Sequence, residues 1–517
     1  MSRGGDGVAV FLEVPSETVR APAPTPNSDP EFQLGERSGL ATKRRRLHPL
    51  RMLSRTTPFL ALALFVAPAL ARSLAQDPEP APSCAFDPER ASPASASAGD
   101  ALDSAADVAF AIAAIEKECG ALLAAKKIDW KKATAPLLAE AKKVKTPAEH
   151  GKLLVRLLAR LEDGHCEVRP LPAAKDVKLE WPDKSGGPGL FVCKSGKKLY
   201  VKSAWATAAE VGLEPGMELL AIDGLAADKW MEKRVADVRD VVSFSTDQQA
   251  FYYACHWGLA DAVGTRLELE VKTIGGEKKK RTITFTKRNQ VPSGPAFAPE
   301  GLETAGDLAF GRTAAGFGYV HLRRMKESVV DDLDTALAKV GDVPGLVLDF
   351  RANGGGSFDH EAFIGRFVPA GKTIEFAVKH ASAGPRQYGG PIVVIVDAGV
   401  RSAGERAADL FKEDGRGYVI GESATAGMSS QKTTIELPSK LFALYVSTRS
   451  NHARANGGKG LEGLGVIPHE LVEYDAKDLA AKKDTLIARA EALFAKFPQE
   501  KVPYDPAKFG WTAPATK

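Results

Sequence analysis

The chain has 517 residues, of which 44% are hydrophobic and 26% charged, and its formal net charge at pH 7 is +4. This is the balance of an ordinary globular protein, and the length is enough for about three domains. So small a net charge gives no case for nucleic acid as a partner. The five cysteines match no zinc spacing, and because their number is odd they cannot all pair within the chain.

The first 99 residues are expected to lie outside the fold. Residues 1–51 mix Pro, Gly, Ser and charge without periodicity, which indicates disorder or a mis-assigned extension before Met52. Basic residues, an apolar run and a small-x-small end predict a secretory signal peptide over residues 52–75. The chain is therefore expected to be exported, periplasmic or secreted, with no stable membrane span once matured. The alternative is an uncleaved anchor, although the apolar run is shorter than the about 20 residues of a span. A Pro/Ala/Ser linker follows over residues 76–99.

Residues 100–175 form a predicted N-terminal helical region. Its last helix carries a leucine stripe at helical spacing and stops at Gly164, so His165 follows in a loop. A lone histidine is usually a surface or satisfied core residue, yet this position can aim a side chain. Cys166 is adjacent but points the other way on an extended chain, so we do not pair the two. The helices are predicted at 102–125, 129–143 and 147–162.

Residues 185–290 resemble a PDZ domain of the circularly permuted bacterial protease type. The resemblance is carried by the sequence GLEPGMELLAIDG, which ends at Gly224. PDZ domains add a peptide as a strand and hold its terminal carboxylate with backbone N–H groups. Gly189, Leu190 and Phe191 resemble that loop and are the candidate substrate-binding residues. The alternative is a PDZ-shaped spacer without a ligand. The aromatic insertion at 241–259 is expected to pack against a neighbouring domain.

Residues 305–475 are the predicted catalytic core, and Ser402 lies at its most informative point. A β-branched run at 391–396 predicts a buried strand, and the pattern after Ser402 predicts a helix. A serine at such a turn can be a nucleophile, because helix-start N–H groups point the same way. It can also be an ordinary helix cap. This stretch alone leaves both interpretations open.

A second glycine-rich turn follows the strand Leu346–Asp349. Three glycines at 354–356 allow the backbone to approach a ligand and expose N–H groups. The Gly-x-x-x-x-Gly-Lys-Ser/Thr pattern is absent, which argues against nucleotide binding. We therefore predict neither a cofactor nor a metal. The polar trio Asp359, His360 and Glu361 is interpreted as a solvated loop leading into a helix.

The motifs in chain order resemble those of the tail-specific, or C-terminal processing, serine peptidase family. They are Asp-Gly-His, the PDZ-like segment, DFRANGGG, RSAGE, GESATAG and LEGLGVIP. The resemblance covers about residues 100 to 475 and implies an α/β core related to the crotonase and Clp protease cores. Ser402 matches the family nucleophile. The common branch pairs its serine with a lysine, but Met428 stands at that position here, and Lys432 is displaced by four residues.

The tricorn-core-like branch of the family uses serine, histidine and glutamate instead. Its motifs imply His165 as the general base and Glu462 as its orienting carboxylate. The resemblance also implies an oxyanion hole made by the Ala403 N–H and an N–H of the glycine turn, with Gly355 favoured. The position after the proline, aspartate in the family, is His469 here.

We therefore expect a multidomain α/β protein that acts as an exported serine endopeptidase with polypeptide as its partner. No oligomeric state is predicted. The alternative is a catalytically inactive member that binds a peptide or a small apolar ligand, or a scaffold in which the PDZ-like domain does the work. His452 is a secondary candidate base. Residues 476–517 are expected to form a packing helix and a polar tail.

Overall fold

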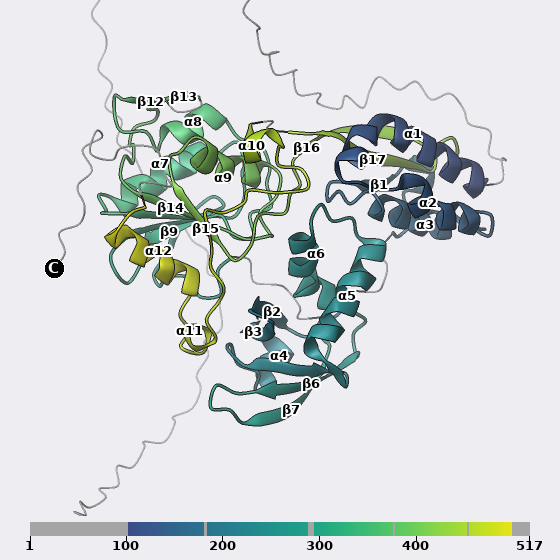
Figure 1. Ribbon diagram of the computed structural model, residues 1–517, viewed down its shortest axis with the longest axis horizontal. Helices are drawn as coiled ribbons and strands as arrows, with labels where there is room; N and C mark the ends of the chain where they lie inside the picture. The colour runs from purple at the N-terminus through teal and green to yellow at the C-terminus, as the bar shows by residue number, and fades with distance from the viewer. Residues whose placement is uncertain (1–101, 180–183, 288–293, 376–377, 452–453, 499–517) are drawn as a thin grey trace, which may run out of the picture. The chain divides into compact units, whose positions relative to one another are not determined.

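The computed structural model describes residues 102–179, 184–287, 294–375, 378–451 and 454–498 (Figure 1). The predicted extension, signal peptide and linker before residue 100 lie outside the described residues, as do His452 and the tail after residue 498. Across the described ranges, no helix is both long enough and apolar enough to span a bilayer.

A seven-stranded sheet forms the centre of the predicted catalytic core. All five residues of the interior strand β14 (Ile392–Val396) are fully buried, which suits a sheet covered on both faces. Five neighbouring strands are parallel, and the last two continue the sheet antiparallel. The spatial order is β18 (Glu470–Leu471), β15 (Tyr418–Gly421), β14, β11 (Leu346–Asp349), β10 (Gly318–Leu322), β9 (Leu308–Arg312) and β8 (Glu303–Ala305).

Helices cover both faces of this sheet. Side chains alternate along β14, so that Val394 belongs to one apolar core while Val393 and Ile395 belong to another. The first core includes side chains of α7 (Val329–Val340), α8 (His360–Gly365) and α9 (Ala403–Glu413), and the second includes those of α12 (Thr485–Ala495). The predicted α/β fold of the core is confirmed. Four smaller elements complete it: β12 (Thr373–Glu375), β13 (Lys379–Ala381), α10 (Ala455–Gly458) and α11 (Ala476–Ala480).

A second, smaller sheet lies within residues 190–284 and has its own apolar core. We call this part the small sheet domain. Its edge strand β2 (Leu190–Ser195) pairs only with β3 (Lys198–Ala204) among the strands described. The other strands are β4 (Glu218–Ile222), β5 (Leu225–Ala226), β6 (Arg266–Lys272) and β7 (Lys278–Thr284), and the helices are α4 (Ala206–Glu210), α5 (Ala227–Val241), α6 (Asp247–Ala254) and η3 (Trp257–Leu259).

The N-terminal helices match the predicted spans closely and pack on a hairpin from the catalytic core. They are α1 (Ser104–Ala125), α2 (Trp130–Ala141) and α3 (Pro147–Ala159), followed by β1 (Glu167–Pro170) and η2 (Pro172–Ala174). The hairpin strands β16 (Ser430–Glu436) and β17 (Phe442–Ser450) form one sheet with β1, in the order β1-β17-β16. Leu444 and Val446 of β17 join the apolar core of the helices, and Figure 1 shows β17 beside α1. This hairpin ties the loop of His165 to the catalytic core.

Candidate active site

Ser402 lies at the turn between β14 and α9 with an unusual backbone conformation. Its φ is 54° and its ψ is −123°, in a region that residues other than glycine rarely adopt and that costs about 1–3 kcal/mol. The Ser402 N–H donates to the carbonyl of Met428 at 3.0 Å and to Glu405 Oε2 at 3.1 Å. Strained strand-to-helix turns of this kind expose a nucleophilic serine in other hydrolases.

Glu405 holds this turn from within the protein. It is fully buried, and its Oε1 accepts hydrogen bonds from the Thr425 hydroxyl at 2.6 Å and the Gly427 N–H at 2.7 Å. Burial raises the pKa of Glu405 to about 8, with a further contribution from Glu462, while these hydrogen bonds oppose the rise. Glu405 therefore supports the turn from the side of the protein core, as a positioning group.

The glycine turn after β11 contacts the Ser402 turn directly. A side chain at Gly355, whose φ is 79°, would place its Cβ 2.7 Å from the Arg401 carbonyl oxygen and 2.9 Å from Ser402 Cβ. Only glycine fits so close an approach. The two turns are also joined by a hydrogen bond from the Arg401 N–H to the Asn353 carbonyl at 3.0 Å.

The two predicted oxyanion donors therefore lie side by side, but they differ in whether the N–H group is already hydrogen-bonded. The ideal Cβ position of Gly355 is 3.2 Å from the Ala403 nitrogen. Within the described residues, the Ala403 N–H has no acceptor, as expected for the first residue of a helix. The Gly355 N–H donates to Asn353 Oδ1 at 2.9 Å. An oxyanion would have to compete with this side-chain amide for the second donor.

The loop that carries His165 is fixed by two serines. The N–H of Asp163 donates to Ser243 Oγ at 2.8 Å, and the N–H of Gly164 donates to Ser245 Oγ at 3.0 Å. Both serines belong to the segment between α5 and α6. The predicted insertion thus packs against a neighbouring part of the chain, where it positions the histidine loop.

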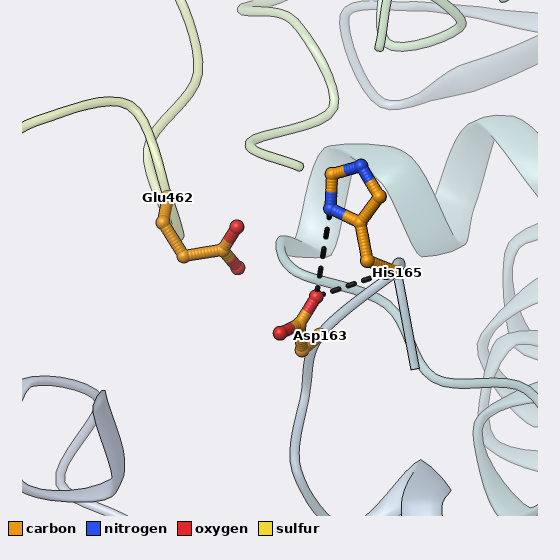
Figure 2. A group of neighbouring side chains, drawn as sticks. All are labelled: Asp163, His165 and Glu462. Atoms are coloured by element: carbon orange, nitrogen blue, oxygen red, sulfur yellow. Dashed lines mark hydrogen bonds and ion pairs between the residues drawn. The ribbon is translucent and has the colours of Figure 1, made fainter. Parts of the chain in front are cut away.

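His165 presents Nδ1 to other polar groups. Nδ1 lies 4.0 Å from Asp163 Oδ1 and 3.4 Å from the hydroxyl of Ser430, and the same Asp163 oxygen accepts the His165 N–H at 2.9 Å. Figure 2 shows the other ring nitrogen, Nε2, on the side away from the carboxylates. Among described residues Nε2 has no hydrogen-bond partner. The ring is thus arranged to keep Nε2 available as a base.

The pKa of His165 is lowered to about 4, first by burial and next by the positive charge of Lys432. Arg401 and Lys126 lower it further, and Asp163 acts in the opposite direction. The imidazole is therefore neutral at neutral pH, which is the form that accepts a proton.

Glu462 is buried and already surrounded by donors. Its Oε1 accepts hydrogen bonds from Lys126 Nζ at 2.9 Å and from the Ser245 hydroxyl at 2.8 Å, and its Oε2 accepts the Ser429 N–H at 3.0 Å. Burial raises the pKa of Glu462 to about 7, and the charge of Asp163 adds to this, whereas Lys126 opposes it. The ammonium of Lys126 thus partly neutralises the carboxylate.

The structure places His165 and Glu462 close together, and Met428 links Ser402 to the His165 loop. Met428 contacts both the Ser402 turn and the histidine loop. Its carbonyl accepts the Ser402 N–H, and a Cβ on Gly164 would lie 2.6 Å from Met428 Sδ. No hydrogen bond joins Ser402 to His165, or His165 to Glu462, within the described chain. Ligand atoms of His165, Glu462 and Asp163 all lie within 4.8 Å of one another (Figure 2). Catalytic hydrogen bonds are often long in the absence of substrate.

Of the predicted substrate-binding residues, Leu190 and Phe191 begin β2, and Gly189 directly precedes it. Leu190 and Phe191 are only 2% and 4% exposed. The N–H of Val192 donates to the carbonyl of Cys255 at 3.0 Å, so part of the outer edge of β2 is already paired. An added peptide strand at this edge would have to displace the segment after α6.

The polar trio Asp359, His360 and Glu361 begins a helix, as predicted. Asp359 caps α8 by accepting the Ala362 N–H at 3.0 Å, and Glu361 pairs with His380 at 2.9 Å. These side chains serve the helix start and a separate ion pair. By contrast, the His165 cluster has the ligand spacing of a metal site, but the Lys126 ammonium already supplies its positive charge.

Several groups of this site were given no role from the sequence. Asp163 stands two residues before His165, a spacing that could have drawn attention to it. Lys126, Ser243 and Ser245 lie in no motif, and only the folded chain brings them to the histidine loop.

Comparison with known proteins agrees with this geometry. Residues 316–472 match the model of peptidase family S41. The chain is 27% identical over 256 residues to a chloroplastic C-terminal processing peptidase of Tetradesmus obliquus, covering 47% of this chain and 50% of the relative. It is 25% identical over 283 residues to a carboxyl-terminal-processing protease of Synechocystis, covering 52% and 57%. The chain thus spans about half the length of these curated relatives.

A solved structure shares the fold. Mature CPAF superposes with a TM-score of 0.53 at 12% identity, covering 75% of this chain and 95% of CPAF. A serine on a strained strand-to-helix turn is how α/β-hydrolases present their nucleophile. Residues 316–472 thus resemble a peptidase family S41 domain, and the chain is similar to C-terminal processing peptidases over about half its length.

Proposed function

We propose that this chain is an exported serine endopeptidase that cleaves unfolded or C-terminal peptide segments through an acyl-enzyme. Ser402, His165 and Glu462 would form its triad. The observation that carries the proposal is the strained turn of Ser402, held against Gly355 and beside a helix-start N–H without an acceptor in the described structure. Strain of this kind persists where the surrounding structure enforces it, as at functional sites.

In the proposed reaction, the Ser402 hydroxyl attacks the scissile carbonyl while His165 Nε2 takes its proton. His165 then gives that proton to the leaving amine, and a water molecule hydrolyses the acyl-enzyme by the same steps. Glu462 stabilises the imidazolium that forms in each half. The Ala403 N–H would bind the oxyanion, a contact worth roughly 3–4 kcal/mol in a similar enzyme. Gly355 would supply the second donor once its N–H leaves Asn353.

The substrate side of the proposal rests on family resemblance and on the small sheet domain. A polypeptide is the substrate expected of a processing peptidase, and the domain would engage it at β2 in the manner of a PDZ domain. Because the β2 edge is partly paired with Cys255, engagement requires the segment after α6 to move. Export is supported by the signal-peptide pattern alone.

The proposal is tested by Ser402→Ala. The variant should lose hydrolysis of an unfolded protein by at least about a thousandfold, because the nucleophile is gone. Its thermal unfolding should stay close to that of the wild type, since the turn is held by backbone hydrogen bonds. The measurement is proteolysis of a denatured protein, followed by gel and mass spectrometry. Undiminished cleavage by a clean preparation of the variant would refute the assignment.

A second candidate function is that of a non-catalytic binding protein. It is favoured by Met428, which stands in place of the lysine of the common branch, and by the absence of a hydrogen bond between Ser402 and His165 among the described residues. It predicts that wild type and Ser402→Ala bind peptides or small apolar ligands equally and that neither cleaves.

A further inference from the structure

The carboxylate of Asp163 lies near the His165 ring, and the triad predicted from the sequence does not include it. Its side chain is 4% exposed, and its Oδ1 lies 4.0 Å from Nδ1. The same oxygen accepts the His165 N–H at 2.9 Å, and the Asp163 N–H is held by Ser243. Asp163 and His165 therefore belong to one short turn whose backbone these hydrogen bonds hold. Figure 2 shows the carboxylate facing the ring edge that carries Nδ1.

The carboxylate oxygens of Glu462, by contrast, already accept hydrogen bonds from other groups. Three donors occupy it, namely Lys126 Nζ, the Ser245 hydroxyl and the Ser429 N–H, all at 2.8–3.0 Å. A carboxylate has about four acceptor positions, so one remains for an imidazole N–H. Ser430 also faces Nδ1 but is neutral, so it can fix the ring tautomer without balancing an imidazolium charge.

We propose that Asp163 is a positioning residue for His165, which accepts the Nδ1–H and shares with Glu462 the stabilisation of the imidazolium. The inference rests on the proposed function and deepens it. Closure needs only that the Nδ1–Oδ1 distance shorten from 4.0 Å to about 3 Å. In the step where Nε2 takes the Ser402 proton, the new positive charge then lies between two carboxylates, one held in the same turn.

Charged groups from four other parts of the chain act on the imidazole alongside Asp163. Lys126 and Glu462 form the ion pair described above, and Lys432 of β16 and Arg401 of the Ser402 turn both oppose protonation of the ring. Three cations therefore lower the pKa of the base. Two carboxylates offset the positive charges of these cations better than Glu462 alone. This is the electrostatic reason for a second acidic residue, Asp163, beside His165.

The test compares Asp163→Asn with Glu462→Gln and the double variant. The asparagine oxygen can still accept the His165 N–H, so only the charge is removed. We expect kcat to fall at least about tenfold with KM within about twofold, because the charge acts on the transition state. The acid limb of kcat/KM should move to lower pH, since Asp163 raises the pKa of His165. Asp176→Asn, exposed in the same region, is the matched control.

Wild-type kcat and pH profile in a folded Asp163→Asn variant would overturn the inference while leaving the proposed function intact. If the wild type itself shows no Ser402-dependent cleavage, the proposed function fails and the inference falls with it. A measurement on the unmodified chain covers the case in which Asp163→Asn does not fold. In a ¹⁵N-histidine NMR spectrum, assigned with His165→Gln, His165 should carry its proton on Nδ1 at neutral pH. A proton on Nε2 would contradict the role of Asp163.

Discussion

Met428 stands at the sequence position where the motif of the common branch implies a lysine. Its carbonyl accepts the Ser402 N–H, and Gln249 Nε2 lies 2.7 Å from its sulfur. The side chain is buried and packs against Gly164. A methionine cannot accept a proton from serine, so the proposed mechanism takes its base from the histidine loop that Met428 contacts.

Lys432 influences that base at a distance. It lies on β16 at a bulge, and its charge is the second-largest cause, after burial, of the low pKa of His165. In Lys432→Met the pKa of His165 should rise, because one of the charges opposing protonation is removed. The acid limb of kcat/KM should therefore move to higher pH, which a profile from pH 4 to 9 would measure.

The exposed Lys440, in the turn between β16 and β17, offers the control for this prediction. Lys440→Met should leave the profile unchanged. An unchanged acid limb in Lys432→Met, or one displaced to lower pH, would mean that another group controls the base.

At the scale of elements, one buried ion pair joins the small sheet domain to the catalytic core. Lys202 of β3 is 1% exposed, and its Nζ lies 2.9 Å from Oε1 of Glu422, which follows β15. Burial disfavours the charge of Lys202, but Glu422 and neighbouring groups outweigh this and hold its pKa well above the usual range. Lys202 thus keeps its charge in the interior.

Asp397 lies in the field of the same pair and holds both turns of the active site. Its Oδ1 accepts the N–H groups of Ala352 and Gly399, one in each turn. Burial raises the pKa of Asp397 to about 6, with Glu422 next, while Lys202 lowers it. The charge of Lys202 therefore stabilises a carboxylate on which the Ser402 turn depends.

Lys202→Met should destabilise the protein markedly. It removes the Lys202 charge from the half-buried Glu422 and the buried Asp397, and breaking a buried pair on one side costs about 3–5 kcal/mol. The double variant Lys202→Met/Glu422→Gln should recover part of the loss. The free energy of unfolding in urea measures both.

Lys198→Met serves as the control on the same strand. Its ion pair with Glu218 is solvent-exposed, so its removal should change stability little. Equal unfolding midpoints for Lys202→Met and Lys198→Met would show that the buried pair does not stabilise the fold.

At the scale of the whole molecule, the residues of the site follow elements that pack in separate apolar cores. His165 follows the core of the N-terminal helices, and Ser402 follows the core under the seven-stranded sheet. The β16–β17 hairpin begins directly after Ser429, whose N–H binds Glu462, and packs on those helices. Assembly of the catalytic groups therefore depends on packing between distant parts of the chain.

The elements that are locally encoded could be predicted from the sequence. The buried strand before Ser402, the helix after it and the three N-terminal helices follow from apolar periodicity and capping patterns. Ser402, Gly355 and His165 could be selected because glycine turns and motif order mark them. The packing of β16 and β17 could not, since a pairing with β1 about 270 residues away leaves no local pattern.

The same limit applies to the electrostatics of the site. Lys126 meets Glu462 only because α1 ends beside the histidine loop, and nothing near Lys126 in the sequence signals this. Glu405 belongs to a recognised motif, yet its role depends on burial against Thr425 and Gly427. Charge and burial are properties of the folded neighbourhood, so local patterns cannot supply them.

Labelling of Ser402 by a fluorophosphonate probe tests the central claim most directly, because only an activated serine reacts readily. The wild type should be labelled at Ser402, as mapped by mass spectrometry, and His165→Gln should react at least about a hundredfold more slowly. Met428→Lys should not be needed for labelling. A wild type that stays unlabelled, while Met428→Lys reacts, would contradict the histidine-based site and indicate an inactive family member.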